Sequence, residues 1–326
     1  MEMETITIET ILEHLPYRRM DIRFFAERPV HMRHWIGAVL RNNFLRAAEE
    51  VHDAQGISLR QRLDTLPLPE QHFLYGQLCG GFPKGFFFDC SDIPYEAPGF
   101  VLQANRVYTV SLVRVGRCAG ADEEFVEAVR RMFARGFGHP VVPLSVIDIV
   151  EDTYTFASPD ARDMNGWLEL TFKTPVCLMR SSREDSQGYQ NKLNYFPSFY
   201  QLMRSLSYRL LTLGILYGDC DPWTDRRQMD DWVQDYIVPS VRAMLMQADL
   251  RYEKRYGTPK GGEKSVYVMG GYVGKLAFGN VLFAYIPVLD FASGLGVGGD
   301  IQYGLGCFAV KYRNHKSNTK GYESDY

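Results

Sequence analysis

Side chains that exchange protons near neutral pH are concentrated at the start of the chain. Four histidines, His14, His31, His34 and His52, lie within the first 52 residues, and histidine is the side chain best suited to proton exchange at physiological pH. His31, His34 and Arg41 are spaced three and seven residues apart, so on a helix they would share one side. Such a group would combine a general acid or base with a cation for an anionic substrate.

The segment from Ser293 to Cys307, SGLGVGGDIQYGLGC, is rich in glycine. Its glycines are Gly294, Gly296, Gly298, Gly299, Gly304 and Gly306. Glycine lets backbone amides approach a ligand closely, and runs of such amides bind phosphate-like anions. The alternative is a flexible connector, and Tyr303 would either stack on a base or fill a core. No Gly-Lys-Ser/Thr follows and a strand is predicted next, which excludes a P-loop and a dinucleotide-binding turn.

Composition limits the classes of protein to which the chain can belong. It has 326 residues, of which 46% are hydrophobic, and its formal net charge is −3. This charge argues mildly against nucleic acid as a partner, although a local basic face can coexist with it. The scattered cysteines predict no zinc site, no other metal and a reducing cytoplasm, and no cofactor fingerprint occurs; they are Cys79, Cys90, Cys118, Cys177, Cys220 and Cys307. We expect a cytoplasmic protein without a signal peptide or a membrane span.

Hydrophobic periodicity predicts the elements that must position these residues. In the first half we expect strands and helices at 6–12 (strand), 29–51 (helix), 85–90 (strand), 106–115 (strand), 122–135 (helix ending at Gly136) and 141–156 (strand). In the second half we expect a strand at 167–180, helices at 196–218 and 227–246, a hairpin at 266–279 turning at Gly270–Gly271, a helix at 282–291 and a strand at 307–312.

Both halves therefore repeat the order strand, helix, strand, strand, helix, strand. That order is typical of ferredoxin-like domains. Turn-forming residues at 158–166 indicate a boundary. We predict an α+β fold with two tandem ferredoxin-like (βαββαβ) domains, residues 1–160 and 161–312, followed by a disordered tail at 313–326.

Several segments resemble one known family in the same order along the chain. The C-terminal stretch is GGYVGKLAFGNVLFAYIPVLDFASGLGVGGDIQYGLGCFAVKY, and its part from Gly296 to Gly306 fits the form GxGxxxxxGxG. Upstream segments with the same resemblance are IGAVLRNNF, APGFVLQANRVYTVSLVRVG, ARGFGHPVVPLSVIDIV and LELTFKTPV. Together they resemble the CRISPR-associated pre-crRNA endoribonucleases, which are members of the RAMP superfamily.

The resemblance implies that two ferredoxin-like domains hold a CRISPR repeat RNA and cut it without a metal. In this chemistry the ribose 2′-hydroxyl attacks the adjacent phosphate and leaves a 2′,3′-cyclic phosphate and a 5′-hydroxyl. The reaction needs a base for the 2′-hydroxyl, an acid for the leaving oxygen, and cations or hydrogen-bond donors for the charged phosphorane.

The resemblance also assigns roles to residues. Relatives commonly place a catalytic histidine at or just after the first helix, so His34 is the first candidate, His52 the second and His31 the partner. Arg33 and Arg41 would hold phosphate. The remaining predicted RNA contacts are Lys275, with Lys260 and Lys264 nearby, and Gly294, Gly296, Gly298, Gly299, Tyr303, Gly304 and Gly306.

Two other interpretations stay open at this point. A catalytically inactive RAMP-type scaffold that holds crRNA in an effector complex is favoured by the negative net charge and by Asp300, where many relatives carry Lys, Arg or Thr. A protein-interaction module without RNA is the second alternative. The expected partners are CRISPR repeat RNA, other CRISPR effector or adaptation proteins, and in a homodimer a second copy of the chain.

Overall fold

The computed structural model describes residues 7–79, 81–95, 100–157, 166–178, 197–257 and 268–314. The predicted boundary at 158–166 and the predicted tail lie almost entirely outside these residues.

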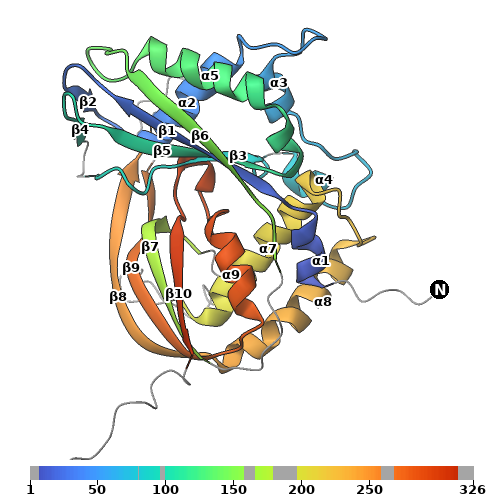
Figure 1. Cartoon of the computed structure of the whole chain (residues 1–326). Coiled ribbons are helices and arrows are strands. Elements are labelled where there is room, and N and C mark those ends of the chain that lie inside the picture. Colours follow the sequence, from blue (N-terminus) through green and yellow to red (C-terminus); the bar gives the residue numbers. More distant parts are fainter. Residues whose placement is uncertain are drawn as a thin grey trace, which may run out of the picture.

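The first half forms a four-stranded antiparallel sheet in the order β3-β5-β1-β6. The order of strands and helices along the chain is that of a ferredoxin-like domain, as predicted, but its first strand is β1 and not the segment 6–12. Helices α2 and α5 lie on one face of this sheet, and the second half of the chain lies on the other side (Figure 1). The bounds are β1 Tyr17–Phe25, α2 Ile36–Ala48, β3 Phe86–Asp89, β5 Tyr108–Val115, α5 Asp122–Arg135 and β6 Ser145–Tyr154.

The second half forms another four-stranded antiparallel sheet, in the order β10-β7-β9-β8. Counted along the chain, its strands follow the same spatial order as those of the first sheet, so the fold is a tandem of two ferredoxin-like units. The bounds are β7 Gly166–Val176, α7 Phe199–Tyr217, β8 Met244–Tyr256, β9 Val268–Val281, α9 Tyr285–Ser293 and β10 Phe308–Asn314.

Shorter elements decorate these two units. A small two-stranded sheet pairs β2 with β4. The bounds of the shorter elements are α1 Ile8–Glu13, β2 Val30–Met32, α3 Leu59–Asp64, α4 Tyr75–Leu78, β4 Phe100–Leu102, η1 Gly116–Gly120, α8 Arg226–Ile237, η3 Val238–Arg242 and η4 Ile301–Tyr303.

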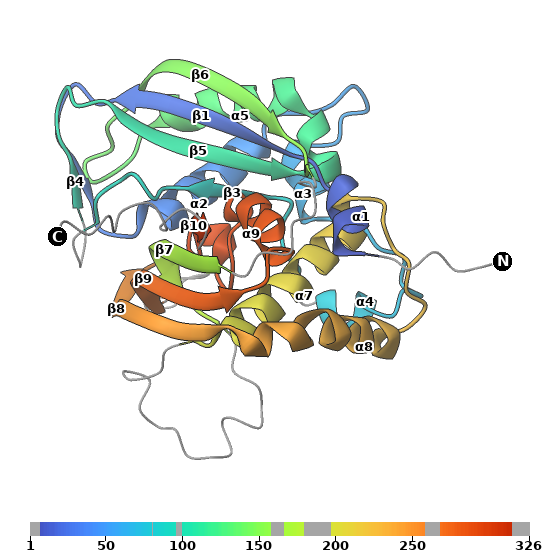
Figure 2. The ribbon, with the colours of Figure 1, turned by 60° about the horizontal axis from the view of Figure 1, so that its bottom comes forward.

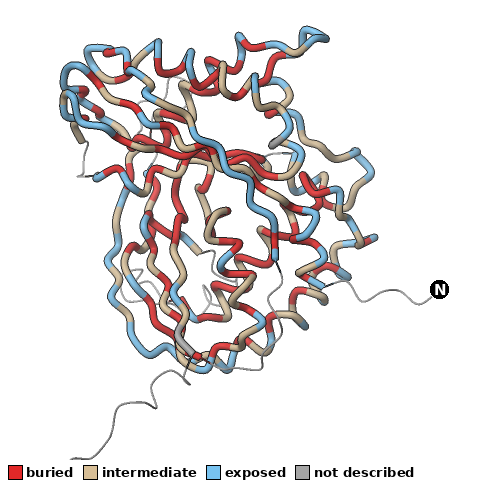
Figure 3. The backbone as a smooth tube through the Cα atoms, in the orientation of Figure 1, coloured by how far each residue is buried: buried red, intermediate tan, exposed pale blue. Residues whose placement is uncertain are grey.

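Two hydrophobic cores hold the fold, and one of them crosses between the units. Side chains of β5 alternate between them: Val110 and Leu112 face α2 and α5, whereas Val113 and Val115 join the core built around α7 and α9. The first sheet is therefore buried on both faces over β5, as the continuous buried stretch in Figure 3 shows. This shared core fixes the two units against each other.

The predicted strand at 6–12 is wrong, because residues 8–12 lie in α1. Thr7 caps the helix by accepting a hydrogen bond from the Thr10 amide, and Ile8, Ile11 and Leu12 have the spacing of a buried helical face. Figures 1 and 2 place α1 beside α7 of the second unit. The short apolar alternation of this segment fits both kinds of element, and packing on α7 decides between them.

The predicted hairpin turn at Gly270–Gly271 is also wrong. Both glycines lie inside β9, which pairs along its length with β8. A Cβ on Gly271 would lie 2.5 Å from the Val176 carbonyl oxygen, so a close approach of strands requires this glycine. The helix predicted at 227–246 accordingly ends at Ile237, and strand β8 begins at Met244.

The first predicted helix begins later than expected. Residues 30–32 form β2, and α2 starts only at Ile36. His31 and His34 therefore precede the helix, and the shared helical side predicted for them with Arg41 does not form.

Candidate functional site

The glycine-rich segment leaves α9, makes the single turn η4 and enters β10, and it is seated on the first unit. The indole Nε1 of Trp35 donates a hydrogen bond to the Tyr303 carbonyl oxygen at 2.6 Å. A Cβ on Gly37 would lie 2.1 Å from the same oxygen, and a Cβ on Gly304 would lie 2.5 Å from the Phe88 carbonyl oxygen. Glycine at both positions therefore lets this segment contact α2 and β3 backbone to backbone.

Several amides of this segment are engaged within the protein. They donate to backbone carbonyls as Gly294 to Phe291, Gly296 to Ala292, Gly299 to Cys177, Gly304 to Ile301 and Gly306 to Pro175, at 2.8–3.2 Å. These five amides hold the shape of the loop. An anion next to this segment would therefore be bound mainly by side chains from neighbouring elements.

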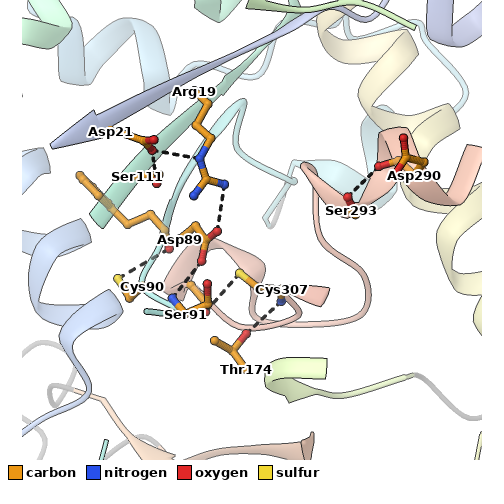
Figure 4. Close-up of polar contacts among 12 residues, drawn as sticks. Arg19, Asp21, Asp89, Cys90, Ser91, Ser111, Thr174, Asp290, Ser293 and Cys307 are labelled. Carbon is orange, nitrogen blue, oxygen red and sulfur yellow. Dashed lines mark hydrogen bonds and ion pairs between the residues drawn. The ribbon is translucent and has the colours of Figure 1, made fainter. Parts of the chain in front are cut away.

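Polar contacts from both units surround the end of the segment (Figure 4). The Cys307 amide donates to the Thr174 hydroxyl at 2.9 Å. On the facing side Arg19 bridges Asp21 at 2.9 Å and Asp89 at 3.1 Å. Burial opposes ionisation of Asp89, but the Ser91 amide and Arg19 hold the pKa of this carboxyl below its usual value. Asp89 therefore stays ionised next to the loop, and Arg19 balances its negative charge.

A cleft of about 840 Å³ opens between the two units beside the loop. Three cations line it from three different elements: Arg41 on α2, Lys84 before β3, and Arg209 on α7. The other lining residues include Asn42, Asp64, Phe82, Gly298, Gly299, Asp300, Gln302 and Tyr303. The folded chain therefore supplies from other elements the positive charge that the glycine-rich segment lacks.

Burial shapes the chemistry of these cations. It lowers the pKa of Arg41, whose guanidinium carbon lies 5.1 Å from the centre of the half-buried Tyr303 ring. Within the described residues the Arg41 Nε has no hydrogen-bond partner. Burial likewise lowers the pKa of Lys84, which an ion pair of 3.1 Å to Asp64 partly offsets. Cations removed from water in this way gain from an anionic ligand.

Arg209 is the most enclosed of the three cations. Burial lowers its pKa to about 10, and its Nη2 donates to the Leu295 carbonyl oxygen at 2.8 Å. It therefore ties α7 to the start of the glycine-rich segment while facing the cleft.

The three candidate histidines lie at different places. His34 is partly buried just before α2, and its Nδ1 is buried with no hydrogen-bond partner in the described part of the chain. Burial, with smaller contributions from the charges of Arg33 and His139, lowers the pKa of His34. His31 is exposed on β2. His52 is exposed beyond the C-terminal end of α2, whose 13 residues span about 20 Å along the helix axis.

The predicted RNA contacts outside the cleft are separate from it. Arg33 is exposed next to His34. Lys275 lies on β9, exposed, with an ion pair of 3.2 Å to Glu169. Lys260 and Lys264 fall outside the described residues. The structure thus brings Arg41, Tyr303 and the glycines together, and leaves Lys275 on the second sheet.

The second unit is similar to a known family. Residues 170–308 match the family model of the CRISPR-associated endoribonuclease Cas6. The second half of the chain is similar to the Cas6 family over this range. No curated protein sequence is significantly similar to the chain.

Solved structures extend the Cas6 fold to the first unit. The Thermus thermophilus Cas6 TTHB231 in its product complex superposes with a TM-score of 0.54 at 14% identity, over 90% of this chain and 100% of that one. A partial Cas6-RT-Cas1–Cas2 complex gives a TM-score of 0.56 at 10% identity over 93% of this chain, which spans 47% of that longer chain. At these identities the likeness shows a shared fold.

The residues of the site lie partly inside and partly outside the range that matches Cas6. The matched range contains the glycine-rich segment and Arg209, while His34, Arg41 and Lys84 lie outside it. Sequence reasoning missed Lys84 and Arg209. Lys84 in GFPKGF carried a weak signal, a cation between glycines before a buried strand, and Arg209 had none beyond an arginine within an apolar helix.

Two kinds of feature are absent from the described residues. Histidine, cysteine and carboxylate side chains do not assemble there into a group of three or more that would ligate a metal. None of the helices in the described ranges combines the length and apolar character of a bilayer crossing.

Proposed function

We propose that this chain binds CRISPR repeat RNA across the cleft and cleaves it without a metal, by attack of a ribose 2′-hydroxyl on the adjacent phosphate. The observation that carries the proposal is the placement of Arg41, Lys84 and Arg209 around one cleft beside the Cas6 glycine-rich segment. His34 lies two residues before the start of α2, and Arg41 lies about 8 Å along the axis of that helix from Ile36. Proton-transfer and phosphate-binding groups would thus act on neighbouring nucleotides.

In this proposal His34 is the general base. Its lowered pKa keeps the imidazole neutral at pH 7, so it can accept the 2′-hydroxyl proton. The 2′-oxygen then bonds to phosphorus, the bond from phosphorus to the 5′-oxygen breaks, and a proton from an acid converts the leaving oxygen into a 5′-hydroxyl. His31 is the proposed partner acid. The products are a 2′,3′-cyclic phosphate and a 5′-hydroxyl.

The cleft cations would stabilise the negative charge of the RNA backbone and of the phosphorane. Arg41 would do so with its guanidinium, which lines the cleft, and the Tyr303 ring beneath it would offer a surface for a base. We further propose that the protein works in the cytoplasm with other CRISPR proteins, because a fold relative is part of a Cas6-RT-Cas1–Cas2 complex.

A catalytically inactive RNA-binding scaffold is the second candidate. The engagement of five loop amides within the protein and the position of Asp300 on the cleft favour it, since both reduce the attraction of the loop for phosphate. It differs from the first candidate in predicting binding without cleavage.

The test is cleavage of labelled repeat RNA in EDTA, with a matched RNA that carries a 2′-deoxy sugar at the cut site. We expect cleavage of the first RNA only, and a loss of rate of about 10²–10⁴-fold in His34→Ala with binding retained. His52→Ala, at the far end of α2, is the matched histidine control. Binding without cleavage would select the scaffold, and absence of both would refute RNA as the ligand.

A further inference from the structure

We propose that Trp35 is a positioning residue for cleavage, because it joins His34, the glycine-rich segment and the end of β8 in one fixed arrangement. This inference rests on the proposed function, since it concerns the alignment of His34 with RNA in the cleft. It assigns no chemical step to Trp35 itself.

The polar atoms of Trp35 bind two segments that are far apart in the sequence. Its backbone amide donates to the Tyr256 carbonyl oxygen, at the end of β8, at 2.7 Å. Its indole Nε1 donates to the Tyr303 carbonyl oxygen at 2.6 Å. The side chain is only 1% exposed, so both bonds are shielded from water. A single residue of the first unit thereby holds two separate parts of the second.

The Trp35 ring is one wall of a cage around a buried cation. The guanidinium carbon of Arg255 lies 5.1 Å from the Trp35 ring centre and 4.2 Å from that of Tyr95. The two rings meet edge to face at 5.3 Å. Arg255 is 6% exposed, and Glu253 balances its charge at 2.6 Å. Cation–π attraction is strongest for such a desolvated pair, so the cage locks the end of β8 onto Trp35.

The local sequence does not explain a tryptophan at this position. Trp35 occupies the N-cap of α2 and makes no side-chain hydrogen bond to the helix. Ser, Thr, Asp or Asn would satisfy the helix amides better at an N-cap. The tertiary contacts of the ring account for the residue instead, at the cost of an uncapped helix.

The connection to His34 is direct. The two residues share a peptide bond, and the buried Nδ1 of His34 has no hydrogen-bond partner among the described residues. The orientation of the imidazole therefore depends on the backbone that Trp35 fixes. A displacement of about 1 Å at a reacting group can cost roughly 100-fold in rate.

The experiment compares Trp35→Phe with Trp223→Phe, another buried tryptophan that packs on Trp232 in the second core. Arg255→Met is compared with Arg251→Met, since Arg251 also pairs with Glu253 at 2.6 Å but is exposed. Arg255→Lys, which keeps the charge, tests for rescue. The readouts are the single-turnover cleavage rate, the Kd for uncleavable 2′-deoxy repeat RNA, and amide hydrogen exchange of the segment 294–306 without RNA.

We expect Trp35→Phe and Arg255→Met to lower the single-turnover rate by about 10- to 100-fold, with the Kd within about 3-fold of wild type. Exchange of the segment 294–306 should rise in Trp35→Phe and stay unchanged in Trp223→Phe. Arg255→Lys should recover part of the rate.

Other outcomes separate the failure of this inference from that of the proposed function. A wild-type rate in Trp35→Phe, or an equal loss in Trp223→Phe, overturns the positioning role. A loss of affinity as large as the loss of rate also overturns it, because the role would then be in binding. If wild-type protein neither binds nor cuts repeat RNA, the proposed function and the catalytic role of Trp35 fall together. Hydrogen exchange then still decides whether Trp35 holds the loop.

Discussion

At the scale of single residues, the ionisation of His34 is set by its surroundings. Burial lowers its pKa, and the positive charges of Arg33 and His139 lower it further by disfavouring the imidazolium. Proton transfer by this residue is therefore expected to be most effective in the neutral form. The consequence can be measured directly in the pH dependence of cleavage.

We expect the single-turnover rate to rise with pH as His34 loses its proton, with the midpoint of this rise below about 6.5, the ordinary histidine value, and to fall again at higher pH as the proposed acid loses its proton. Arg33→Met removes one of the charges that disfavour the imidazolium, so it should move the midpoint upward. Arg130→Met, an exposed arginine on α5, should leave it unchanged. A flat profile, or a downward shift in Arg33→Met, would contradict the assignment of His34 as base.

Arg41 should contribute to binding through phosphate rather than through base identity. Arg41→Ala is expected to weaken binding of different RNA sequences about equally and to lower the slope of log K against log salt by about 1. The measurement is a salt titration of affinity with repeat RNA and a scrambled RNA. Arg130→Ala should leave the slope unchanged. A sequence-dependent loss would instead place Arg41 against a base.

At the scale of elements, the glycine-rich segment connects α9 to β10 and packs against α2 and β3. Its contact with α2 depends on Gly37, where any side chain would meet the Tyr303 carbonyl oxygen at 2.1 Å. Alanine in a helix normally stabilises relative to glycine by up to about 1 kcal/mol. Packing and intrinsic helix preference thus predict opposite signs at this position, which makes the substitution informative.

Gly37→Ala should lower the free energy of unfolding by about 1–3 kcal/mol, because the added methyl group displaces the segment. The affinity for repeat RNA should fall by about 10-fold, which is about 1.4 kcal/mol of binding free energy, because the displaced segment lines the cleft. Gly76→Ala on α4, where a Cβ meets open space, should be neutral or stabilising. Denaturant unfolding and gel-shift binding measure both. If Gly37→Ala stabilises the protein, the segment does not pack tightly against α2.

Most of the order of elements after β1 could be predicted from the sequence, because long amphipathic helices and alternating strands carry strong periodicity. The prediction failed where the pattern was short or exposed. Residues 6–12 alternate in a way that suits helix or strand, and β8 carries the charged run QADLRYEKRY on an edge of the sheet. Such an edge strand forms because it pairs with β9, and the local sequence pattern does not record this pairing.

The site was predictable only in part, for a related reason. The glycines, Arg41 and His34 stand out by local density or spacing. Lys84 and Arg209 come together only in the cleft that forms when the two units pack, and their spacing in the sequence does not indicate this.

At the scale of the whole molecule, the two units are interlocked rather than merely adjacent. Helix α1 precedes the first sheet in the chain but packs on α7, and Val113 and Val115 of β5 reach into the same core. The cleft, which lies between the units, therefore keeps its shape only while this shared core is intact.

Interlocking predicts that the protein unfolds as one cooperative unit. Leu12, fully buried on α1, belongs to the core of the second unit, although it lies on the first unit's side of the linker. Leu12→Ala should lower the free energy of unfolding by about 2–5 kcal/mol, and signals from both units should shift together. Ile57→Ala, at an exposed loop position, should change it by less than about 0.5 kcal/mol. Thermal unfolding followed by far-UV circular dichroism and by tryptophan fluorescence tests this, since the first signal reports on both units, Trp223 and Trp232 on the second, and Trp35 on the contact between them. Two separate transitions, with only one of them moved by Leu12→Ala, would show that the units fold independently and that the cleft is an adjustable gap rather than a preformed site.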